Sequence, residues 1–145
     1  MAAPAMTMLR PAAHADHAFL LDVRKQGLRD DVIRVWGAWE NERQSRYVRR
    51  LLSGDDLRIV CCNGEDGGML TVKTTAESLH IENIFLLPAF KGMGIGTELI
   101  QDVCDRGREL GLPVTLHVLR ASRARSLYER LSFCIVGETR THFRM

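Results

Sequence analysis

Three glycines at positions 92, 94 and 96 are each separated by one residue in this 145-residue chain. A short apolar segment that ends at Pro88 precedes them, and a segment with helical spacing begins at Gly96 or Thr97. Because glycine has no Cβ atom, successive N–H groups of such a turn can point into one concavity, and the positive end of the following helix favours negative charge there. The segment predicts an anion site suited to a diphosphate; a plain strand-to-helix turn is the alternative.

Two other glycine motifs fit this segment less well. A P-loop needs a lysine before its final Ser or Thr, but here Gly96 directly precedes Thr97. A dinucleotide-binding fingerprint that starts at Gly92 or Gly94 needs a small residue where Thr97 or Leu99 stands.

The segment instead resembles the acetyl-CoA loop of the GNAT superfamily of N-acetyltransferases, Gln/Arg-x-x-Gly-x-Gly/Ala. Lys91, Gly94 and Gly96 occupy its three defining positions, with Lys91 in place of Gln or Arg and Met93 where a basic residue is frequent. The resemblance implies acetyl-CoA as the cosubstrate. It assigns to cofactor binding the residues Lys91, Gly92, Met93, Gly94, Ile95, Gly96 and Thr97.

The strand before the loop, residues 84–87, is also similar to the family pattern. In that family the strand separates from its neighbour, and its backbone groups pair with the pantetheine arm. The resemblance implies cofactor contacts from Phe85, Leu86 and Leu87. We expect the amides of Phe85 and Leu87 to polarise the thioester carbonyl, as an oxyanion hole does. Acetyl-CoA would then lie between this strand and a strand at residues 114–119.

Residues 120–133 resemble the family's Asn-x-x-Ala-x-x-Leu-Tyr-x-x-x-Gly-Phe stretch, with Ser122 at the Asn position and Ser132 at the Gly position. Tyr128 keeps the place of the family's general acid. A phenol of pKa about 10 is a neutral donor that can protonate the departing thiolate of CoA; a core aromatic is the alternative role. The resemblance implies that Ser122 contacts the cofactor. Arg125 and neighbouring arginines either meet the 3′-phosphate of CoA or form an exposed basic face.

The reaction also needs a base, because an ammonium group cannot attack a thioester. We expect Glu82, on the strand that leads into the site, to deprotonate the amine directly or through water, although it could simply face solvent. His80 shares the strand face of Glu82 by alternation. His117, on another strand, is a further candidate, and we place it among the residues that contact the acceptor.

The acceptor side is predicted from the aromatic and acidic residues Trp36, Trp39 and Glu40. Residues 35–42 resemble a Trp-Gly-Trp-Asp/Glu-Glu pattern of some small bacterial GNAT proteins. Aromatics beside carboxylates can receive a cationic amine. The alternative is that Trp36 and Trp39, three residues apart, belong to the core on one helix face. The expected acceptor is a primary amine of a small molecule or a peptide.

Hydrophobic periodicity predicts an α/β or α+β domain around one mixed sheet. The resemblance implies a mostly antiparallel sheet of six to seven strands with a splayed central pair, flanked by about four helices. Asp16 is a predicted N-cap and Gly27 a predicted helix stop. The expected helices are 16–26, 30–52 broken at Gly37, 96–110 and 123–131; the expected strands are 6–10, 57–62, 69–73, 79–87, 114–119, 133–136 and 139–144.

Composition sets limits on the remaining possibilities. Hydrophobic residues make up 46% of the chain and the net charge is +2, which suits one globular domain over residues 1–145 and argues against nucleic acid as the main partner. We expect no membrane span, no secretory signal and no metal, and therefore a cytoplasmic protein. A homodimer is an expectation from the family. Two other functions are possible alternatives. One is an acyl-CoA-binding sensor without turnover, and the other is a module that binds nucleic acid through the arginines of residues 120–130.

Overall fold

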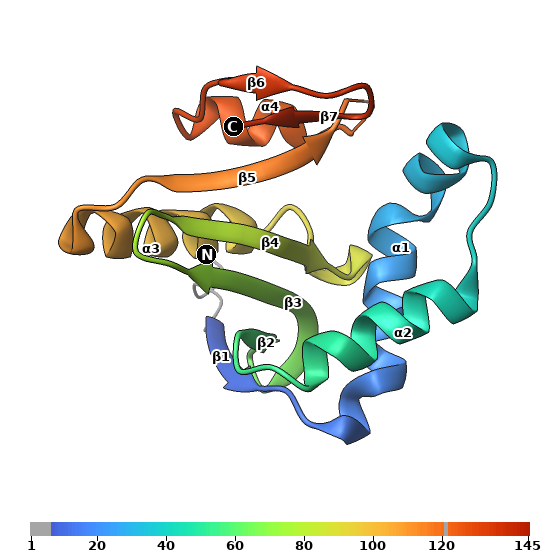
Figure 1. Cartoon of the computed structure of the whole chain (residues 1–145). Coiled ribbons are helices and arrows are strands. Elements are labelled where there is room, and N and C mark those ends of the chain that lie inside the picture. Colours follow the sequence, from blue (N-terminus) through green and yellow to red (C-terminus); the bar gives the residue numbers. More distant parts are fainter. Residues whose placement is uncertain (1–6, 121) are drawn as a thin grey trace. The chain divides into compact units, whose positions relative to one another are not determined.

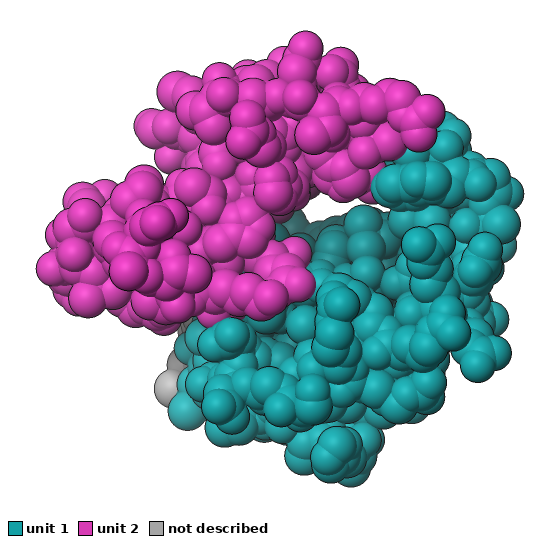
Figure 2. All heavy atoms as spheres, in the orientation of Figure 1, with its two compact units in different colours: residues 1–71, 83–96 teal, residues 72–82, 97–145 magenta. Residues whose placement is uncertain are grey.

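The computed structural model describes residues 7–120 and 122–145, which form two compact units (Figures 1 and 2). Unit 1 comprises the described residues up to Thr71 together with Asn83–Gly96; unit 2 comprises Val72–Glu82 and the described residues from Thr97 onward. Strands β3 (Glu65–Thr74) and β4 (Leu79–Leu86) run from one unit into the other. The hydrogen-bonded strand order is β1-β2-β3-β4-β5-β7-β6 in a 7-stranded, mostly antiparallel sheet, which confirms the predicted fold class.

Unit 1 contains the N-terminal strands and helices. Strand β2 lies between β1 and β3 and is antiparallel to both. Asn63 and Gly64 have positive φ values of 52° and 84°, so β2 and β3 are joined by a two-residue turn of the kind that hairpins favour. Strand β3 therefore begins earlier than predicted. The other elements of unit 1 are β1 (Thr7–Pro11), the 3-10 turn η1 (His14–Asp16), α1 (His17–Trp36), α2 (Asn41–Leu52), β2 (Leu57–Cys62) and the 3-10 turn η2 (Pro88–Phe90).

The first strand was predicted from residue 6, which lies outside the described residues. The expected strand ended at residue 10, but β1 also includes Pro11, which lies opposite Arg58 of β2. Since β1 is the terminal strand of the sheet, the missing N–H of proline costs no ladder bond on its outer edge.

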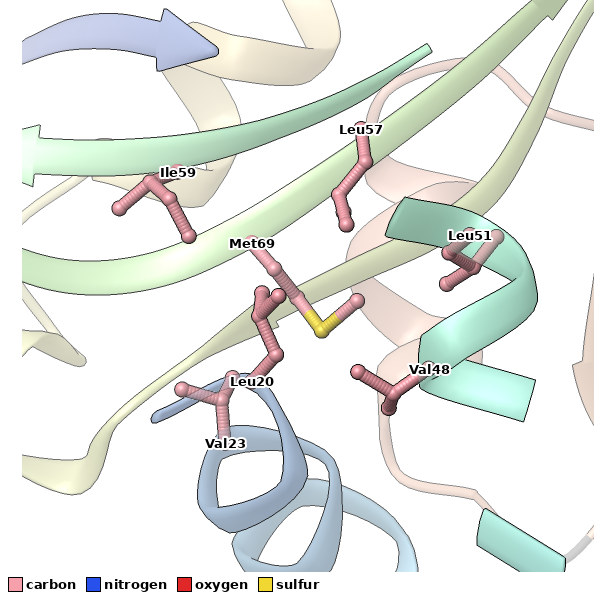
Figure 3. Close-up of a cluster of buried hydrophobic side chains, with 7 residues drawn as sticks. All are labelled: Leu20, Val23, Val48, Leu51, Leu57, Ile59 and Met69. Carbon is pink, nitrogen blue, oxygen red and sulfur yellow. The ribbon is translucent and has the colours of Figure 1, made fainter. Parts of the chain in front are cut away.

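The core of unit 1 forms where α1 and α2 cover the sheet (Figure 3). Apolar residues one helical turn apart supply the helix side, and alternate strand residues supply the sheet side. Burial of such side chains contributes about 1.5–3 kcal/mol each. The cluster consists of Leu20 and Val23 from α1, Val48 and Leu51 from α2, Leu57 and Ile59 from β2, and Met69 from β3.

Helix α1 runs through Gly27, where a stop was predicted, so this prediction is wrong. A Cβ atom at Gly27 would lie 2.6 Å from Cδ1 of Phe85, so this glycine makes room for an aromatic ring of β4. The helix ends instead at Gly37, with φ of 87°, whose N–H donates to the Ile33 carbonyl at 2.8 Å. The predicted break at Gly37 is confirmed.

Unit 2 contains the C-terminal strands and two helices. Strand β4 pairs in parallel with β5 through Leu79–Ile81 and Val114–Leu116, and β7 is antiparallel to both β5 and β6. Buried side chains of helix α3, including Leu99, Ile100 and Val103, supply its apolar face. The elements are α3 (Ile95–Leu110), which begins at the end of unit 1, β5 (Val114–Leu119), α4 (Ala124–Arg130), β6 (Gly137–Glu138) and β7 (His142–Arg144).

The strand predicted at residues 133–136 is wrong. The chain turns at Ser132, whose φ is 73°, and the side chains of Ile135 and Val136 are then exposed, so apolar character here does not mark a strand. Strand β6 follows this segment at Gly137–Glu138, whereas β7, His142–Arg144, lies within the strand predicted at residues 139–144. Within the described residues no helix is long and apolar enough to cross a membrane.

Candidate active site

The glycine-rich segment forms an exposed turn at the start of α3. Residues 91–94 are exposed, whereas Ile95, the first residue of α3, is buried. Gly92 and Gly94 have φ values of 76° and 79°, a conformation that side-chain-bearing residues rarely adopt. Among the described residues, no heavy atom outside the glycine and its two chain neighbours lies within 4 Å of the position that a Cβ would take at either glycine. The turn thus presents open backbone next to a helix N-terminus, an arrangement that favours an anion.

The end of β4 corrects one expectation about backbone donors. The Leu87 N–H donates to the Gly67 carbonyl oxygen of β3 at 2.8 Å, so it is not available to a thioester carbonyl. Peptide groups of successive strand residues point to opposite edges. Leu86 therefore directs its N–H to the edge of β4 that faces away from β3, whereas Phe85 shares the edge of Leu87. The candidate donor at this strand end is Leu86.

The predicted acceptor residues lie at the junction of the two N-terminal helices. Trp36 is the last residue of α1 and is 53% exposed, Trp39 lies in the connection, and Glu40 is the N-cap of α2. The indole N–H of Trp39 donates to Asn41 Oδ1 at 3.1 Å. The two tryptophans do not share a helix face, and Trp36 is not in the core, so the alternative reading of this pair is wrong.

A buried polar network joins α1, α2 and β4 and was not predicted. Arg24 Nη1 donates to Asn83 Oδ1 at 2.6 Å, and Nη2 donates to Gln44 Oε1 at 3.0 Å. Asn83 Nδ2 in turn donates to the Tyr47 hydroxyl at 2.9 Å, and the Arg24 guanidinium lies 4.2 Å from the centre of the Tyr47 ring. Such a network fixes the two helices against β4. The feature of the sequence that could have indicated this network is Asn83, a polar residue on the inward face of an otherwise apolar strand.

Glu82, the predicted base, lies on the part of β4 that belongs to unit 2. Its Oε2 is 3.4 Å from Lys73 Nζ of β3, and the Glu82 side chain is largely buried while that of Lys73 is exposed. The ion pair therefore orients the carboxylate, and a carboxylate is the form of this side chain that accepts a proton.

Three histidines lie on the adjacent strands β4, β5 and β7 of unit 2. The rings of His80 and His117 are 5.1 Å apart, and those of His117 and His142 are 6.4 Å apart. His80 Nδ1 is 2.8 Å from Thr115 Oγ1. Burial lowers the pKa of His80, and the nearby His117 lowers it further. Burial and His117 likewise lower the pKa of His142, so both imidazoles are held towards the neutral form.

Tyr128 lies on α4 and is buried against Phe133, with the ring centres 6.0 Å apart. Burial raises the pKa of Tyr128 to about 12. The phenol therefore keeps its proton throughout the physiological range, as a general acid must.

Ser122 and Arg125 are both engaged within unit 2. The Ser122 hydroxyl oxygen accepts a hydrogen bond from the Ala124 N–H at 3.2 Å, at the start of α4. Arg125 donates to Glu129 Oε1 at 2.6 Å, and its guanidinium lies 4.6 Å from the centre of the Phe143 ring. Contact of either side chain with a cofactor would compete with these interactions.

The described residues contain no group of three or more His, Cys, Asp or Glu side chains suited to hold a metal ion. The glycine turn, the end of β4 and the two tryptophans belong to unit 1. Unit 2 contains Glu82, His117, Ser122, Arg125 and Tyr128.

Comparisons with known proteins agree with this architecture. PaiA N-acetyltransferase from Thermoplasma acidophilum, solved in complex with coenzyme A, is 18% identical with a TM-score of 0.73, over 97% of each chain. Naa50 from Arabidopsis thaliana, in complex with the bisubstrate analogue CoA-Ac-MVNAL, is 14% identical with a TM-score of 0.68, over 95% of each chain. An acetyltransferase from Thermus thermophilus is 17% identical with a TM-score of 0.72, covering 97% of this chain and 96% of the other.

At these identities the solved structures establish the fold. No curated protein has a significantly similar sequence. The profile of the acetyltransferase (GNAT) family matches residues 16–133, which include the glycine turn, Glu82 and Tyr128. The protein therefore belongs to the acetyltransferase (GNAT) family and is an acyltransferase of the N-acetyltransferase type.

Proposed function

We propose that this protein transfers the acetyl group of acetyl-CoA directly to a primary amine of a small molecule or a peptide. The observation that carries the proposal is the exposed turn at residues 91–94, in which two left-handed glycines leave the backbone open beside the start of α3. The coenzyme A bound to the Thermoplasma acidophilum relative supports the choice of cosubstrate.

The proposed cofactor contacts come mainly from backbone groups. The N–H groups of residues 92–97 bind the diphosphate, because they combine open main chain with the positive end of a 16-residue helix. The Lys91 N–H donates to the Pro88 carbonyl at 3.2 Å, so Lys91 contributes through its side chain. The Leu86 amide, on the edge of β4 away from β3, donates to the pantetheine arm or the thioester carbonyl. Phe85 and Leu87 shape this strand end, since the Leu87 N–H is already bound to Gly67.

The proposed chemistry uses two side chains for proton transfer. The ammonium form of the amine first loses a proton to Glu82, directly or through water, and Glu82 passes this proton to solvent. The amine nitrogen then bonds to the carbonyl carbon and the carbon–sulfur bond breaks. Tyr128 donates its phenolic proton to the sulfur, so that CoA leaves as the neutral thiol, and the phenolate regains through water the second proton that the nitrogen loses. Because burial raises the pKa of Tyr128 to about 12, the phenol is protonated at neutral pH and can donate a hydrogen bond to the departing sulfur.

The acceptor is proposed to enter beside Trp36, Trp39 and Glu40. The half-exposed indole of Trp36 offers an aromatic face, and Glu40 offers a carboxylate, which together suit a cationic amine. We also propose, independently of these residues, that His117 on β5 contacts the acceptor.

The direct test is the release of free CoA thiol from acetyl-CoA in the presence of individual amines. The panel contains polyamines, free amino acids and peptides with an unblocked N-terminus. We expect release that depends on one amine class, with a matching gain of one acetyl group in the mass of the acceptor. Binding of acetyl-CoA without turnover on any amine would instead assign the chain to acyl-CoA sensing.

A further inference from the structure

Gly67 of β3 contacts both ends of the short turn that leads into the glycine-rich loop. Its carbonyl oxygen accepts the Leu87 N–H at 2.8 Å, at the start of the turn. At the other end, the ring of Phe90 occupies the space that a Cβ atom of Gly67 would need. Between these points the turn is closed by the Phe90 N–H donating to the Leu87 carbonyl at 2.9 Å. One residue of the sheet thus fixes the path of residues 87–90.

The contact between Gly67 and Phe90 leaves no room for a side chain. A Cβ atom at position 67 would lie 2.9 Å from Cγ of Phe90 and 3.0 Å from Cδ1 and Cδ2. These atoms form the base of the ring, so they cannot move away by bending a flexible chain end. Relief requires rotation about χ1 of Phe90 or displacement of the turn. Gly67 does not have a positive φ, so the restriction at this position is steric and not conformational.

The placement of Phe90 determines where the loop begins. Residues 91–94 are exposed, and in the part of the chain that the structure describes nothing beyond chain neighbours lies within 4 Å of a Cβ built at Gly92 or Gly94. The Lys91 N–H donates to the Pro88 carbonyl at 3.2 Å, within the turn that carries Phe90. The loop is held by its ends, with Phe90 on Gly67 before it and Ile95, 1% exposed, after it. A shift of Phe90 therefore passes directly to the backbone groups of the loop.

We propose that Gly67 is a positioning residue for acetyl-CoA: its bare Cα seats the ring of Phe90, and this contact places the loop amides that bind the diphosphate. The inference rests on the proposed function. It concerns binding of the cosubstrate and not the transfer step, because Gly67 and Phe90 act on the loop and take no part in the proton transfers.

The test compares wild type with Gly67→Ala, Phe90→Ala and the double variant. We expect Gly67→Ala to raise the KM for acetyl-CoA, and the Kd for CoA by calorimetry, about tenfold, with kcat and the amine KM within about twofold of wild type. Phe90→Ala should raise the same two constants. In the double variant the added Cβ has no ring to meet, so its constants should equal those of Phe90→Ala within about twofold. Gly54→Ala is the matched control, because its Cβ meets only the Leu51 carbonyl at 3.6 Å.

Three results would each overturn the inference. The first is an acetyl-CoA KM and a CoA Kd in Gly67→Ala that equal those of wild type. The second is a change in kcat and in the amine KM as large as the change in the cofactor constants, and the third is a double variant in which the effects of the two substitutions add. If Gly67→Ala does not fold, Phe90→Ala decides alone, since it leaves β3 intact: wild-type CoA affinity in that variant overturns the inference. If the wild-type protein binds no CoA, the proposed function itself is rejected. If the wild-type protein binds CoA and neither variant weakens that binding, only the inference about Gly67 is rejected.

Discussion

The amide N–H of Leu87 donates to the carbonyl oxygen of Gly67 at 2.8 Å, which commits the peptide group at the end of β4 to the edge that faces β3. By alternation, the peptide group of Leu86 faces the opposite edge. The N–H group available to a ligand at this strand end is therefore that of Leu86, and not that of Leu87 as the sequence suggested.

The structural role of the Leu87 amide can be tested with Leu87→Pro. Leu87 has φ of −62°, which proline adopts, so the substitution removes the N–H without forcing the backbone. The buried Gly67 carbonyl then loses its donor, at a cost of about 1–3 kcal/mol. Leu87→Ala is the control, since it also removes the side chain but keeps the N–H. In urea denaturation we expect Leu87→Pro to be the less stable by that amount; equal stabilities would contradict the structural role.

Tyr128→Phe tests the proposed general acid. Removal of the hydroxyl should lower kcat by about 100-fold or more, because the thiolate must then leave without a proton donor. CoA affinity should stay within about twofold of wild type, since the ring and its packing on Phe133 are kept. Because burial raises the pKa of Tyr128 to about 12, no loss of wild-type rate from its ionisation is expected between about pH 8 and pH 10. A kcat unchanged by the substitution would remove Tyr128 from the reaction.

Glu82→Gln tests the proposed base. The amide keeps the shape of the side chain but cannot take a proton, so kcat/KM for the amine should fall by about 10- to 100-fold. CoA affinity should not change. The control is Glu77→Gln, an exposed glutamate in the turn before β4. If both variants have wild-type activity, another group or water serves as the base, and His117 becomes the next candidate.

The histidine row predicts a specific dependence of stability on pH. In the unfolded chain His80 titrates at its ordinary pKa of 6.5, whereas burial and His117 lower its pKa in the fold. The unfolded chain therefore binds more protons between these two values, and the free energy of unfolding falls as the pH drops through 6.5. Lys73 acts in the same direction and Glu82 opposes it.

We expect His80→Gln to reduce the loss of stability between about pH 7.5 and pH 5.5, as measured by urea denaturation at each pH. His142, whose pKa is lowered in the same way, should maintain part of the effect. The exposed His14 provides a control, and His14→Gln should retain the full wild-type dependence. A dependence in His80→Gln as steep as that of wild type would contradict this assignment.

Local signals predicted much of the fold. The strand at residues 57–62, the helix end at Gly37 and the long helix after the glycine turn all follow from short-range chemistry, and each appears in the structure. Ser132 stands where the family pattern has glycine, and its φ of 73° is a conformation that glycine adopts more readily than serine.

Contacts between distant residues were not predictable in this way. Gly27 signals a helix stop by itself, and only the ring of Phe85, far along the chain, explains why the helix continues. The partners of Asn83 and the ring seated on Gly67 likewise depend on how strands and helices pack. Periodicity favoured a strand at residues 133–136 because it cannot distinguish exposed apolar residues from buried ones.

The measurement that tests the central claim most directly is calorimetric titration of CoA into wild type, Gly94→Val and Gly54→Ala. A branched side chain cannot readily adopt φ of 79°, so Gly94→Val should close the turn to the diphosphate and abolish measurable binding, whereas Gly54→Ala should bind as wild type does. Undiminished affinity in Gly94→Val, or no binding by wild type, would contradict the assignment of residues 91–97 as the cofactor site.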